Sequence, residues 1–455
     1  MCRDTHVRVL AGVWISLMLA EGCSAQAPSQ QEQQYLFSVL PLIDRGDLAH
    51  AEEQLAAGIE RYPRSAILYN ALGIVTRKEN KIDRAIESFR RALEILPSFT
   101  AAQLQLASIY QQQGRKKDAA ALFRAAGDST SNFDALMTAG LGLADCEEFA
   151  SAIRVLAKAH QLRPDSAPAA YNLALAQYKN GDLAQAIETI GPGGTDREPD
   201  VLYLRGKIKE GLGRADGAAE IVAACRLESA NETFCADAAL ASIRHEKFLE
   251  AVNLVEPALA KSPGSAVLLP LLGLAQFRLG RYQDAIRSYS AALEKDAKLD
   301  ASREGLGFLY YVTGDLEKAR RVVEDGLNNP AADFYLAYLD AMVLYRLSPR
   351  SRLKAGEAVD RAIRSNPGFA PSYFLRGKIA MENNRVTAAL TDFEHAVKLD
   401  PRYPLPYYKM AQIYARQGRA QDAEAARGKF SELGNLREEE ILARQAQDVL
   451  MPANH

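Results

Sequence analysis

A pattern of 34 residues recurs along almost the whole chain and strongly limits the fold it can adopt. It is clearest at residues 66–99, where Leu72 and Gly73 lie on one predicted helix and Ala85 and Phe89 lie on a second. In each helix the apolar residues follow helical spacing, so each helix has one apolar face. The pattern therefore predicts a hairpin of two helices that pack through their apolar faces.

The small residue of the second helix sets the register of the repeats. It recurs at intervals of 32 to 36 residues, at Ala51, Ala85, Ala119, Ala152, Ala186, Ala218, Ala251, Ala285, Ala319, Ala355, Ala389 and Ala423. Twelve residues earlier the first helix nearly always carries glycine or alanine, as at Gly73, Gly140, Gly273, Gly307 and Gly377. The turn between the helices often holds a glycine, which favours the positive φ of a helix C-terminus, at Gly46, Gly114, Gly181, Gly213, Gly280, Gly314 and Gly418.

The unit resembles the tetratricopeptide repeat. The signature places of that repeat are occupied here by Tyr69, Leu72, Gly73, Ala85 and Phe89. The resemblance implies an all-α, right-handed solenoid superhelix of about twelve helix-turn-helix units with a C-terminal capping helix. It also implies a protein-binding surface and no chemistry of its own. Hairpins of this kind bury their apolar faces only by stacking on neighbours. We expect repeats over residues 32–198 and 199–436, then a capping helix and tail over 437–455.

Two units depart from the pattern. Gly191-Pro192-Gly193-Gly194 stands where the second helix of the fifth unit should continue. Glycine and proline should end that helix early, which predicts a hinge between two halves of the array. Ser348-Pro349-Arg350-Ser351-Arg352 replaces the usual turn of the tenth unit, so a different turn geometry is expected there.

The resemblance also implies which residues line the concave side. The first helix of each unit turns one face to its own second helix and another, at places 2, 5, 9 and 12, to this groove. We expect partner-binding residues at Asn70, Arg77, Tyr171, Tyr178, Tyr203, Lys207, Phe277, Phe308, Tyr311, Phe374, Lys378 and Tyr408. Aromatic residues are the usual anchors of protein interfaces. The alternative is that the turns of the superhelix cover some of these rings and make them core.

Residues 1–25 have the character of an export signal. A weakly positive start precedes the apolar run 9–20, which is too short to span a bilayer as an ordinary transmembrane helix. A signal peptidase can cleave after Ala25, and the alternative is lipidation at Cys23. Residues 26–31 then form a polar tether. If the segment is not a signal, it is a short N-terminal helix that stays on the chain.

Cys146, Cys225 and Cys235 lie beyond this leader and show no metal-ligand spacing. Cys225 falls late in the second helix of one unit and Cys235 early in the first helix of the next. These helix ends are expected to be neighbours, so a disulfide can form in an oxidising compartment. The preferred alternative is that the two are small buried apolar side chains.

Charge and histidine spacing argue against other classes of function. The net charge is −2, so no basic excess favours nucleic acid. None of the six histidines has a second metal ligand four residues further along the same helix face, and the repeats leave no room for a separate catalytic domain. No enzyme activity, cofactor or metal is therefore expected.

The sequence thus predicts an exported scaffold that binds proteins or extended peptides along its groove, in cell-envelope or secretion assembly. Its location would be periplasmic or, through a lipid on Cys23, at a bacterial membrane, and otherwise secreted. One alternative is a solenoid that binds glycan or peptidoglycan by stacking sugars on its aromatic residues. Another is a cytosolic adaptor or co-chaperone, if the leader is not an export signal.

Overall fold

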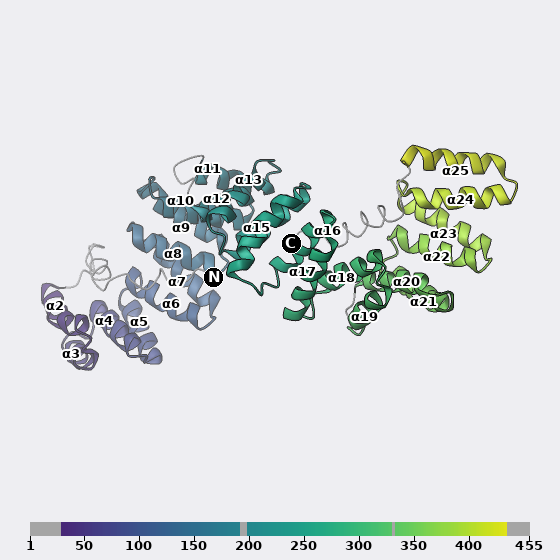
Figure 1. The fold of residues 1–455 in the computed structure, drawn as a ribbon. Coiled ribbons are helices and arrows are strands. Elements are labelled where there is room, and N and C mark those ends of the chain that lie inside the picture. Colours follow the sequence, from purple (N-terminus) through teal and green to yellow (C-terminus); the bar gives the residue numbers. More distant parts are fainter. Residues whose placement is uncertain (1–28, 192–197, 330–332, 435–455) are drawn as a thin grey trace. The chain divides into compact units, whose positions relative to one another are not determined.

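The fold was analysed in a computed structural model, which describes residues 29–191, 198–329 and 333–434. These residues form α-helices in succession and contain no β-strand (Figure 1). The leader over 1–25 with Cys23, the first tether residues, Pro192 to Gly194 and the capping helix expected at 437–455 lie outside the described residues. No helix within the described ranges is long and apolar enough to span a membrane.

The helices pair into twelve hairpins within the described part of the chain. The first six pairs are α2 (Gln30–Asp44) and α3 (Leu48–Arg61), α4 (Ala66–Lys78) and α5 (Ile82–Ile95), α6 (Thr100–Gln112) and α7 (Lys116–Ser129), α8 (Phe133–Asp145) and α9 (Phe149–Leu162), α10 (Ala167–Asn180) and α11 (Leu183–Ile190), and α12 (Pro199–Gly211) and α13 (Gly217–Leu227). The other six are α14 (Glu232–Arg244) and α15 (Phe248–Lys261), α16 (Leu268–Arg278) and α17 (Tyr282–Lys295), α18 (Asp300–Thr313) and α19 (Leu316–Leu327), α20 (Phe334–Leu347) and α21 (Arg352–Ser365), α22 (Ala370–Glu382) and α23 (Val386–Leu399), and α24 (Pro404–Arg416) and α25 (Ala420–Leu433). The predicted all-α solenoid of about twelve repeats is confirmed.

The chain divides into two compact units, residues 1–220 and 221–455, and the division falls within α13. Ion pairs from Arg205 and Lys209 on α12 to Glu220, at 2.8 and 2.7 Å, hold the first turn of α13 against α12. The sequence predicts a junction between two halves of the repeat array after residue 198. Residues next to this position are not described by the structure, so the junction stays a prediction.

The turns between paired helices have one conformation in most repeats. All seven glycines predicted there have positive φ, between 70° and 89°. Four repeats without a glycine reach the same region with Asn80, Glu147, Glu246 or Asn384, at φ from 56° to 65°. A left-handed residue at this point ends the first helix and lets the chain reverse into the second. The exception is the tenth repeat, where a short 3-10 helix, η1 (Pro349–Ser351), makes the turn.

Glycine in the first helix lets a large side chain of the second helix lie against its backbone. A Cβ placed on Gly73 would come within 2.6 Å of the ring of Phe89, which is fully buried. The same crowding recurs between Gly140 and Leu156, Gly273 and Tyr289, Gly307 and Val323, and Gly377 and Phe393. In each case the contacting side chain lies one helical turn after the alanine that sets the register of the second helix.

Replacing Gly73 with alanine should therefore destabilise the protein, by about 1–3 kcal/mol, because the added methyl group overpacks the contact with Phe89. Gly356 is the matched control, because it also lies inside a helix but has open space around its Cβ position. There alanine should raise stability by about 0.5–1 kcal/mol through its higher helix propensity. Urea unfolding followed by circular dichroism measures both. Equal effects at the two glycines would contradict this packing account.

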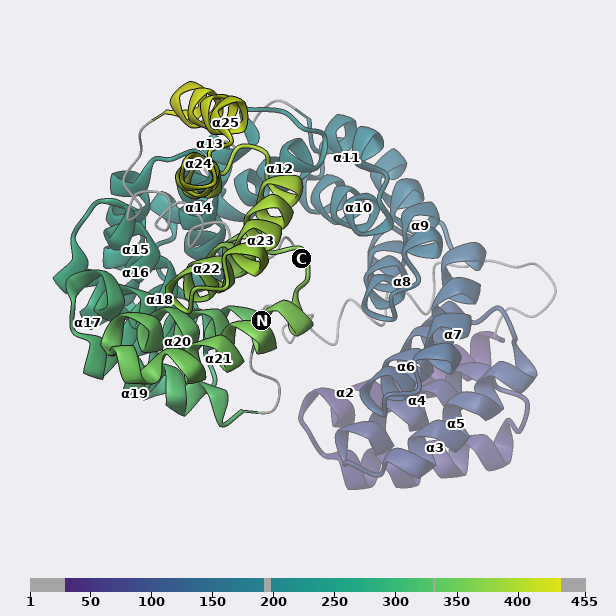
Figure 2. The same cartoon turned by 90° about the vertical axis from the view of Figure 1, so that its right-hand side faces the viewer.

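Stacking of successive hairpins creates the core of each unit. In the first unit the core is continuous from Leu36 on α2 to Ala176 on α10. The first helices of successive hairpins also touch, as α6 does with α8 and α10 with α12 (Figure 2). In the second unit a core around Phe393 and Tyr403 joins α22, α23 and α24. Each hairpin is thus stabilised by its neighbours, as expected of a repeat array.

Two local differences from the regular repeat have clear causes. α11 has only 8 residues and ends at Ile190, because Gly191 follows it with a φ of 66°. The early end of this helix was predicted from the glycines and proline that follow. The first helix, α2, begins at Gln30 rather than after the expected tether, because Ser29 and Glu32 form a capping box with each other's backbone N–H groups.

Candidate binding surface

The twelve residues expected to line the groove fall into two sets by burial. Asn70, Phe277, Phe308 and Phe374 are buried, with 0, 6, 1 and 3% of their surface exposed. The others are partly or largely exposed: Arg77, Tyr171, Tyr178, Tyr203, Lys207, Tyr311, Lys378 and Tyr408. Only this second set is placed to contact a partner without a rearrangement of the helices.

In the first unit the neighbouring helices α10 and α12 carry partly exposed apolar side chains. Tyr171, Leu175 and Tyr178 lie on one side of α10 at helical spacing, and Tyr203 lies on the adjacent α12. These four side chains, here called the tyrosine face, are half-buried. Ala174, Leu204 and Ile208 form the core behind them. A rigid scaffold thus presents aromatic rings that combine apolar area with a polar hydroxyl, as protein interfaces do.

Arg77 has a structural role as well as a position on the expected groove. Its Nη1 donates to Oε1 of Gln105 at 2.6 Å, and its Nη2 donates to Oγ of Ser108 at 3.1 Å. These bonds connect α4 to α6 of the next repeat. Burial lowers the pKa of Arg77. Its guanidinium is therefore committed to the chain rather than open for a partner.

The buried rings of the second unit pack on one another across repeats. The ring centroids of Phe277 on α16 and Phe308 on α18 lie 5.7 Å apart in an edge-to-face contact. Phe374 on α22 lies 5.3 Å from the ring of Tyr403 and 5.7 Å from that of Phe393. These three phenylalanines therefore belong to the core, which is the alternative the sequence left open. Successive helices come close enough to cover side chains that a single repeat would expose.

Lys378 lies among aromatic and acidic side chains of the second unit. Its ammonium group lies 5.0 Å from the ring centroid of Tyr345 and 5.6 Å from that of Phe374. The hydroxyl of Tyr345 donates to Oε1 of Glu382 at 2.6 Å, and Arg352 forms an ion pair with Glu382 at 2.8 Å. This network links α20, α21 and α22 through an ion pair, a hydrogen bond and cation–π contacts. Lys378 thus takes part in packing between repeats.

Ion pairs also connect the same repeats on another side. Nη2 of Arg376 on α22 donates to Oδ1 of Asp392 on α23 at 2.7 Å, and its Nη1 donates to Asp360 on α21 at 3.0 Å. Hydrogen bonds to Asp392 and Asp360 raise the pKa of Arg376. One guanidinium therefore holds three helices together.

Sequence reasoning missed a buried acid on the second unit. Glu304 on α18 is 3% exposed, and its Oε1 has no hydrogen-bond partner. Burial, with Asp333 and Asp300 nearby, raises the pKa of Glu304 to about 8. The available signal was its position, because Glu304 occupies place 5 of its repeat, where Tyr171, Tyr203 and Phe374 stand in others. An acid at a place that is aromatic or apolar in most repeats marks a departure from simple packing.

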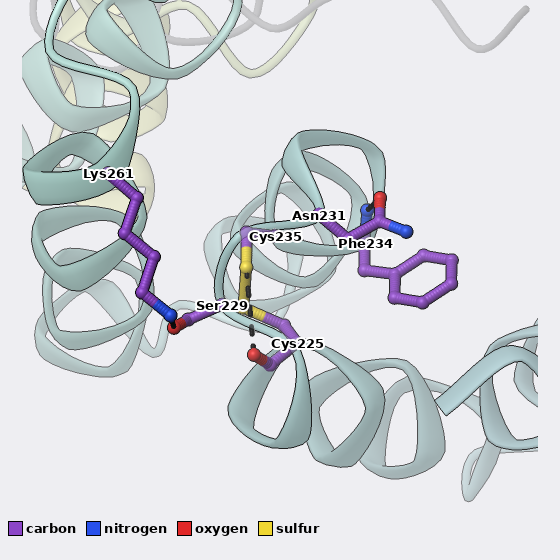
Figure 3. Close-up of a disulfide and its surroundings, with 6 residues drawn as sticks. All are labelled: Cys225, Ser229, Asn231, Phe234, Cys235 and Lys261. Atoms are coloured by element: carbon purple, nitrogen blue, oxygen red, sulfur yellow. Dashed lines mark hydrogen bonds between the residues drawn. A yellow bond between two sulfur atoms is a disulfide. The ribbon is translucent and has the colours of Figure 1, made fainter. Parts of the chain in front are cut away.

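The structure joins Cys225 on α13 to Cys235 on α14 in a disulfide (Figure 3). Their Cα atoms lie 4.8 Å apart, and both side chains are buried. Two further contacts order the short connection between the helices. Nζ of Lys261 donates to Oγ of Ser229 at 2.8 Å, and Oδ1 of Asn231 accepts from the backbone N–H of Phe234 at 3.3 Å. Cys146 is a buried free cysteine of the first unit.

Removing the disulfide should lower the free energy of unfolding by about 2–4 kcal/mol, because the bond closes a loop in the unfolded chain. The comparison is between the oxidised protein and the Cys225→Ser/Cys235→Ser variant, with Cys146→Ser as the control that leaves the bond intact. Mass spectrometry without reductant checks the bond itself. Two free thiols in protein isolated from its native compartment would contradict the disulfide.

Metal ligands do not gather in the described part of the chain. Among these residues no three His, Cys, Asp or Glu side chains lie close enough together to hold a metal ion. Of the described histidines, His50 forms an ion pair with Asp47 on the surface, and His395 lies 4.2 Å from the ring centroid of Tyr373. The hydrogen bond to Asp47 raises the pKa of His50.

Sequence profiles identify the class of protein that these hairpins define. A profile described as tetratricopeptide repeat matches residues 77–139, 143–208 and 276–342, and a second with the same description matches 42–98 and 236–299. A profile described as TPR repeat matches residues 377–418. Together these matches span more than half of the chain. The chain belongs to the tetratricopeptide repeat family, whose members are protein-interaction scaffolds.

No curated protein matches the chain as a relative. Solved structures with a similar fold include Naa15/Naa10 bound to HypK-THB, at 14% identity and a TM-score of 0.42, covering 88% of this chain and 68% of that one. Yeast Tom70 has 13% identity and a TM-score of 0.38 over 92% of this chain and 99% of its own. YrrB, described as a TPR protein with an unusual peptide-binding site, has 20% identity and a TM-score of 0.32 over 43% and 97%.

Proposed function

We propose that this chain is an exported scaffold that binds protein or extended peptide partners, and that the tyrosine face of the first unit is a main contact surface. The observation that carries the proposal is the half-buried row of Tyr171, Tyr178 and Tyr203 on adjacent helices. Aromatic side chains held by a rigid core lose little conformational freedom on binding and dominate interface energies. The family itself supports a role in protein interaction rather than catalysis.

Export is supported by two features. Residues 1–25 have the pattern of a signal segment, with Cys23 as a lipidation candidate. The Cys225–Cys235 disulfide suits an oxidising compartment, where such bonds form and persist. An extracytoplasmic location would suit partners in envelope or secretion assembly. Mass spectrometry of the mature N-terminus tests this: a lipid on Cys23 or a new terminus at Gln26 supports export, and an intact Met1 opposes it.

The binding proposal is tested by crosslinking in native cells followed by mass spectrometry. The Tyr171→Ala/Tyr178→Ala variant should recover the partner on the order of tenfold less than the unaltered chain, since both rings are interface anchors. Leu249→Ala is the matched control, because this leucine is exposed on α15, which belongs to the second unit, whereas the tyrosine face belongs to the first. Circular dichroism checks that each variant keeps its helices.

Two outcomes would oppose the proposal. Equal recovery of the same partner by the tyrosine variant and the control would remove the tyrosine face from the interaction. Capture of a saccharide with no protein partner would favour the alternative of a glycan-binding solenoid, in which the tyrosines stack on sugar rings.

A further inference from the structure

We propose that a cavity in the second unit receives a tyrosine side chain of the protein partner together with a carboxylate close to that tyrosine. Residues of α21, of α22, and of α23 with the turn before it line this cavity, which has a volume of about 370 Å³. The inference rests on the proposed function, because it assumes a protein or peptide ligand. It concerns a different unit from the tyrosine face and has its own tests.

The cavity is accessible from solvent and has a buried floor. Ile379 and Ala380 on α22 form the floor, with 2 and 3% of their surface exposed. Arg385 and Ala388, at the start of α23, line the cavity as exposed residues. A ligand therefore reaches this space without a rearrangement of the helices. The volume lies within the range of known ligand-binding pockets.

The cavity exists where the eleventh repeat and the helix before it have small residues at three places. Ala380, Ala388 and Gly356 line it, and a Cβ added to Gly356 would meet no atom within 4 Å. Larger side chains stand at the corresponding places of two other repeats: Tyr110, Asp118 and Ile86 at the third repeat, and Tyr414, Asp422 and Leu390 at the twelfth. The cavity thus corresponds to space that a tyrosine, an aspartate and an aliphatic side chain fill in those repeats.

In the third repeat an arginine holds the tyrosine and the aspartate together. Nη2 of Arg115 donates to Oδ2 of Asp118 at 2.6 Å. The guanidinium carbon of the same residue lies 3.8 Å from the ring centroid of Tyr110. A guanidinium can bind a carboxylate at its edge and an aromatic ring at its face at the same time. This arginine therefore has both of its preferred contacts within one repeat.

The twelfth repeat has the same arrangement. Nε of Arg419 donates to Oδ2 of Asp422 at 2.7 Å, and its guanidinium carbon lies 4.2 Å from the ring centroid of Tyr414. The hydroxyl of Tyr414 also donates to Oε1 of Glu394, on the second helix of the preceding repeat, at 3.2 Å. The phenol thus uses both its ring and its hydroxyl.

Arg385 is the corresponding arginine of the eleventh repeat, but its own repeat provides neither contact. Ala388 stands in place of the aspartate, and Ala380 stands in place of the tyrosine. Among the described residues the guanidinium of Arg385 has no ion pair, hydrogen bond or ring contact. A carboxylate and a ring from another molecule would restore the arrangement of the third and twelfth repeats.

Asp360 favours a tyrosine ring over a phenylalanine ring. It lines the cavity at the place that Glu394 has beside the twelfth repeat. Its Oδ1 accepts from Nη1 of Arg376 at 3.0 Å, and 46% of its side chain is exposed, so its other oxygen can accept from a phenol. Arg376 also binds Asp392, the second acid of the lining, at 2.7 Å. The two arginines and two aspartates of the lining balance in charge, which leaves Arg385 to attract the carboxylate.

The first test uses 3-(4-hydroxyphenyl)propanoate, which carries a phenol and a carboxylate, as the probe for the full chain. The NMR signal of the Ile379 methyl group reports on the cavity, and Ile379→Val assigns it. We expect 4-ethylphenol, which lacks the carboxylate, to bind about tenfold more weakly, and 3-phenylpropanoate, which lacks the hydroxyl, about threefold more weakly. No shift of the signal, or equal binding of the three compounds, would overturn the inference.

Two variants place the binding on named residues. Arg385→Gln should lose the tenfold preference for the carboxylate. Arg419→Gln should keep it, because this arginine has the same place in its repeat but is already paired with Asp422. Ala380→Tyr/Ala388→Asp, here called the filled variant, should no longer bind the probe, because the chain itself supplies the ring and the carboxylate. Circular dichroism checks the helices of each variant. A preference that survives in Arg385→Gln, or binding by a folded filled variant, would contradict the proposed site.

The last test asks whether the ligand is part of a polypeptide. A library of peptides with blocked ends has one fixed tyrosine and an acidic residue at each neighbouring position in turn. We expect the best of these peptides to bind the unaltered chain at least about tenfold more tightly than the filled variant. Binding of the small probe without any such difference among peptides would assign the cavity to a free aromatic acid and overturn the inference. Loss of partner capture by the Tyr171→Ala/Tyr178→Ala variant, with normal peptide binding at the cavity, would oppose the role proposed for the tyrosine face alone.

Discussion

Replacing Phe89 with alanine should lower the free energy of unfolding by about 3–5 kcal/mol, which is the usual cost of removing a buried aromatic ring. Phe89 is fully buried in the first unit. Its ring lies directly against the backbone of Gly73. The surrounding helices are held by neighbours on both sides, so the cavity left by the ring cannot close easily.

Phe37 provides a matched control for this substitution. It is also a phenylalanine on a helix of the first unit, but 47% of its surface is exposed. Phe37→Ala should change stability by less than about 1 kcal/mol. The double variant Gly73→Ala/Phe89→Ala should lose less unfolding free energy than the two single variants lose together, because the new methyl group enters the space that the ring vacates. Urea unfolding measures all four proteins, and additive effects would contradict direct packing of Phe89 on Gly73.

Replacing Glu304 with glutamine should make the protein more stable above neutral pH. The pKa of Glu304 is raised to about 8 in the folded protein, against an ordinary value of 4.5. The unfolded chain therefore loses this proton at lower pH than the folded chain does. The raised pKa of Glu304 therefore contributes its full share to the free energy of unfolding below about pH 4.5. This contribution declines as the pH rises to about 8, and it no longer changes above that value.

This linkage predicts a measurable difference between the two proteins. Between pH 5 and pH 8 the unaltered chain should lose about 3 kcal/mol more stability than Glu304→Gln does. Both proteins contain the same titratable groups around residue 304. Their contributions to the pH dependence of stability therefore cancel to first order. These groups are Asp300, Asp333 and the buried hydroxyls of Tyr289 and Tyr335. Urea unfolding at the two pH values measures the difference. Parallel pH dependence in the two proteins would show that Glu304 is not a buried neutral acid.

The two substitutions should change stability in opposite directions. Glutamine at residue 304 should stabilise the chain above neutral pH, because it removes an ionisable group that is buried without a hydrogen-bond partner at its Oε1. Phe89, by contrast, serves only packing, and its loss should weaken the array without changing what it recognises.

The fold could be predicted from the sequence because the repeat constrains it many times over. The alanines in phase, the turn glycines and the small residues facing Phe89 or Tyr289 all specify the same hairpin. The short α11 was predicted for the same reason, since Gly191 cannot prolong a helix well. Consistent local signals of this kind give reliable element boundaries.

The binding surface was less predictable, because it depends on contacts between repeats. Place 5 of the repeat is exposed at Tyr408 but buried at Asn70 and Phe374, and one repeat alone does not determine which occurs. The spacing of adjacent helices and the size of their side chains decide it. The unpartnered state of Glu304 likewise follows from what neighbouring helices lack, which no local motif encodes.

Crosslinking in native cells, with the unaltered chain and the Tyr171→Ala/Tyr178→Ala variant compared side by side, tests the central claim most directly. The account predicts that extracytoplasmic proteins are captured by the unaltered chain and by Leu249→Ala, and that the tyrosine variant recovers them on the order of tenfold less. Capture of the same proteins in equal amount by all three chains would contradict the claim that this face binds the partner.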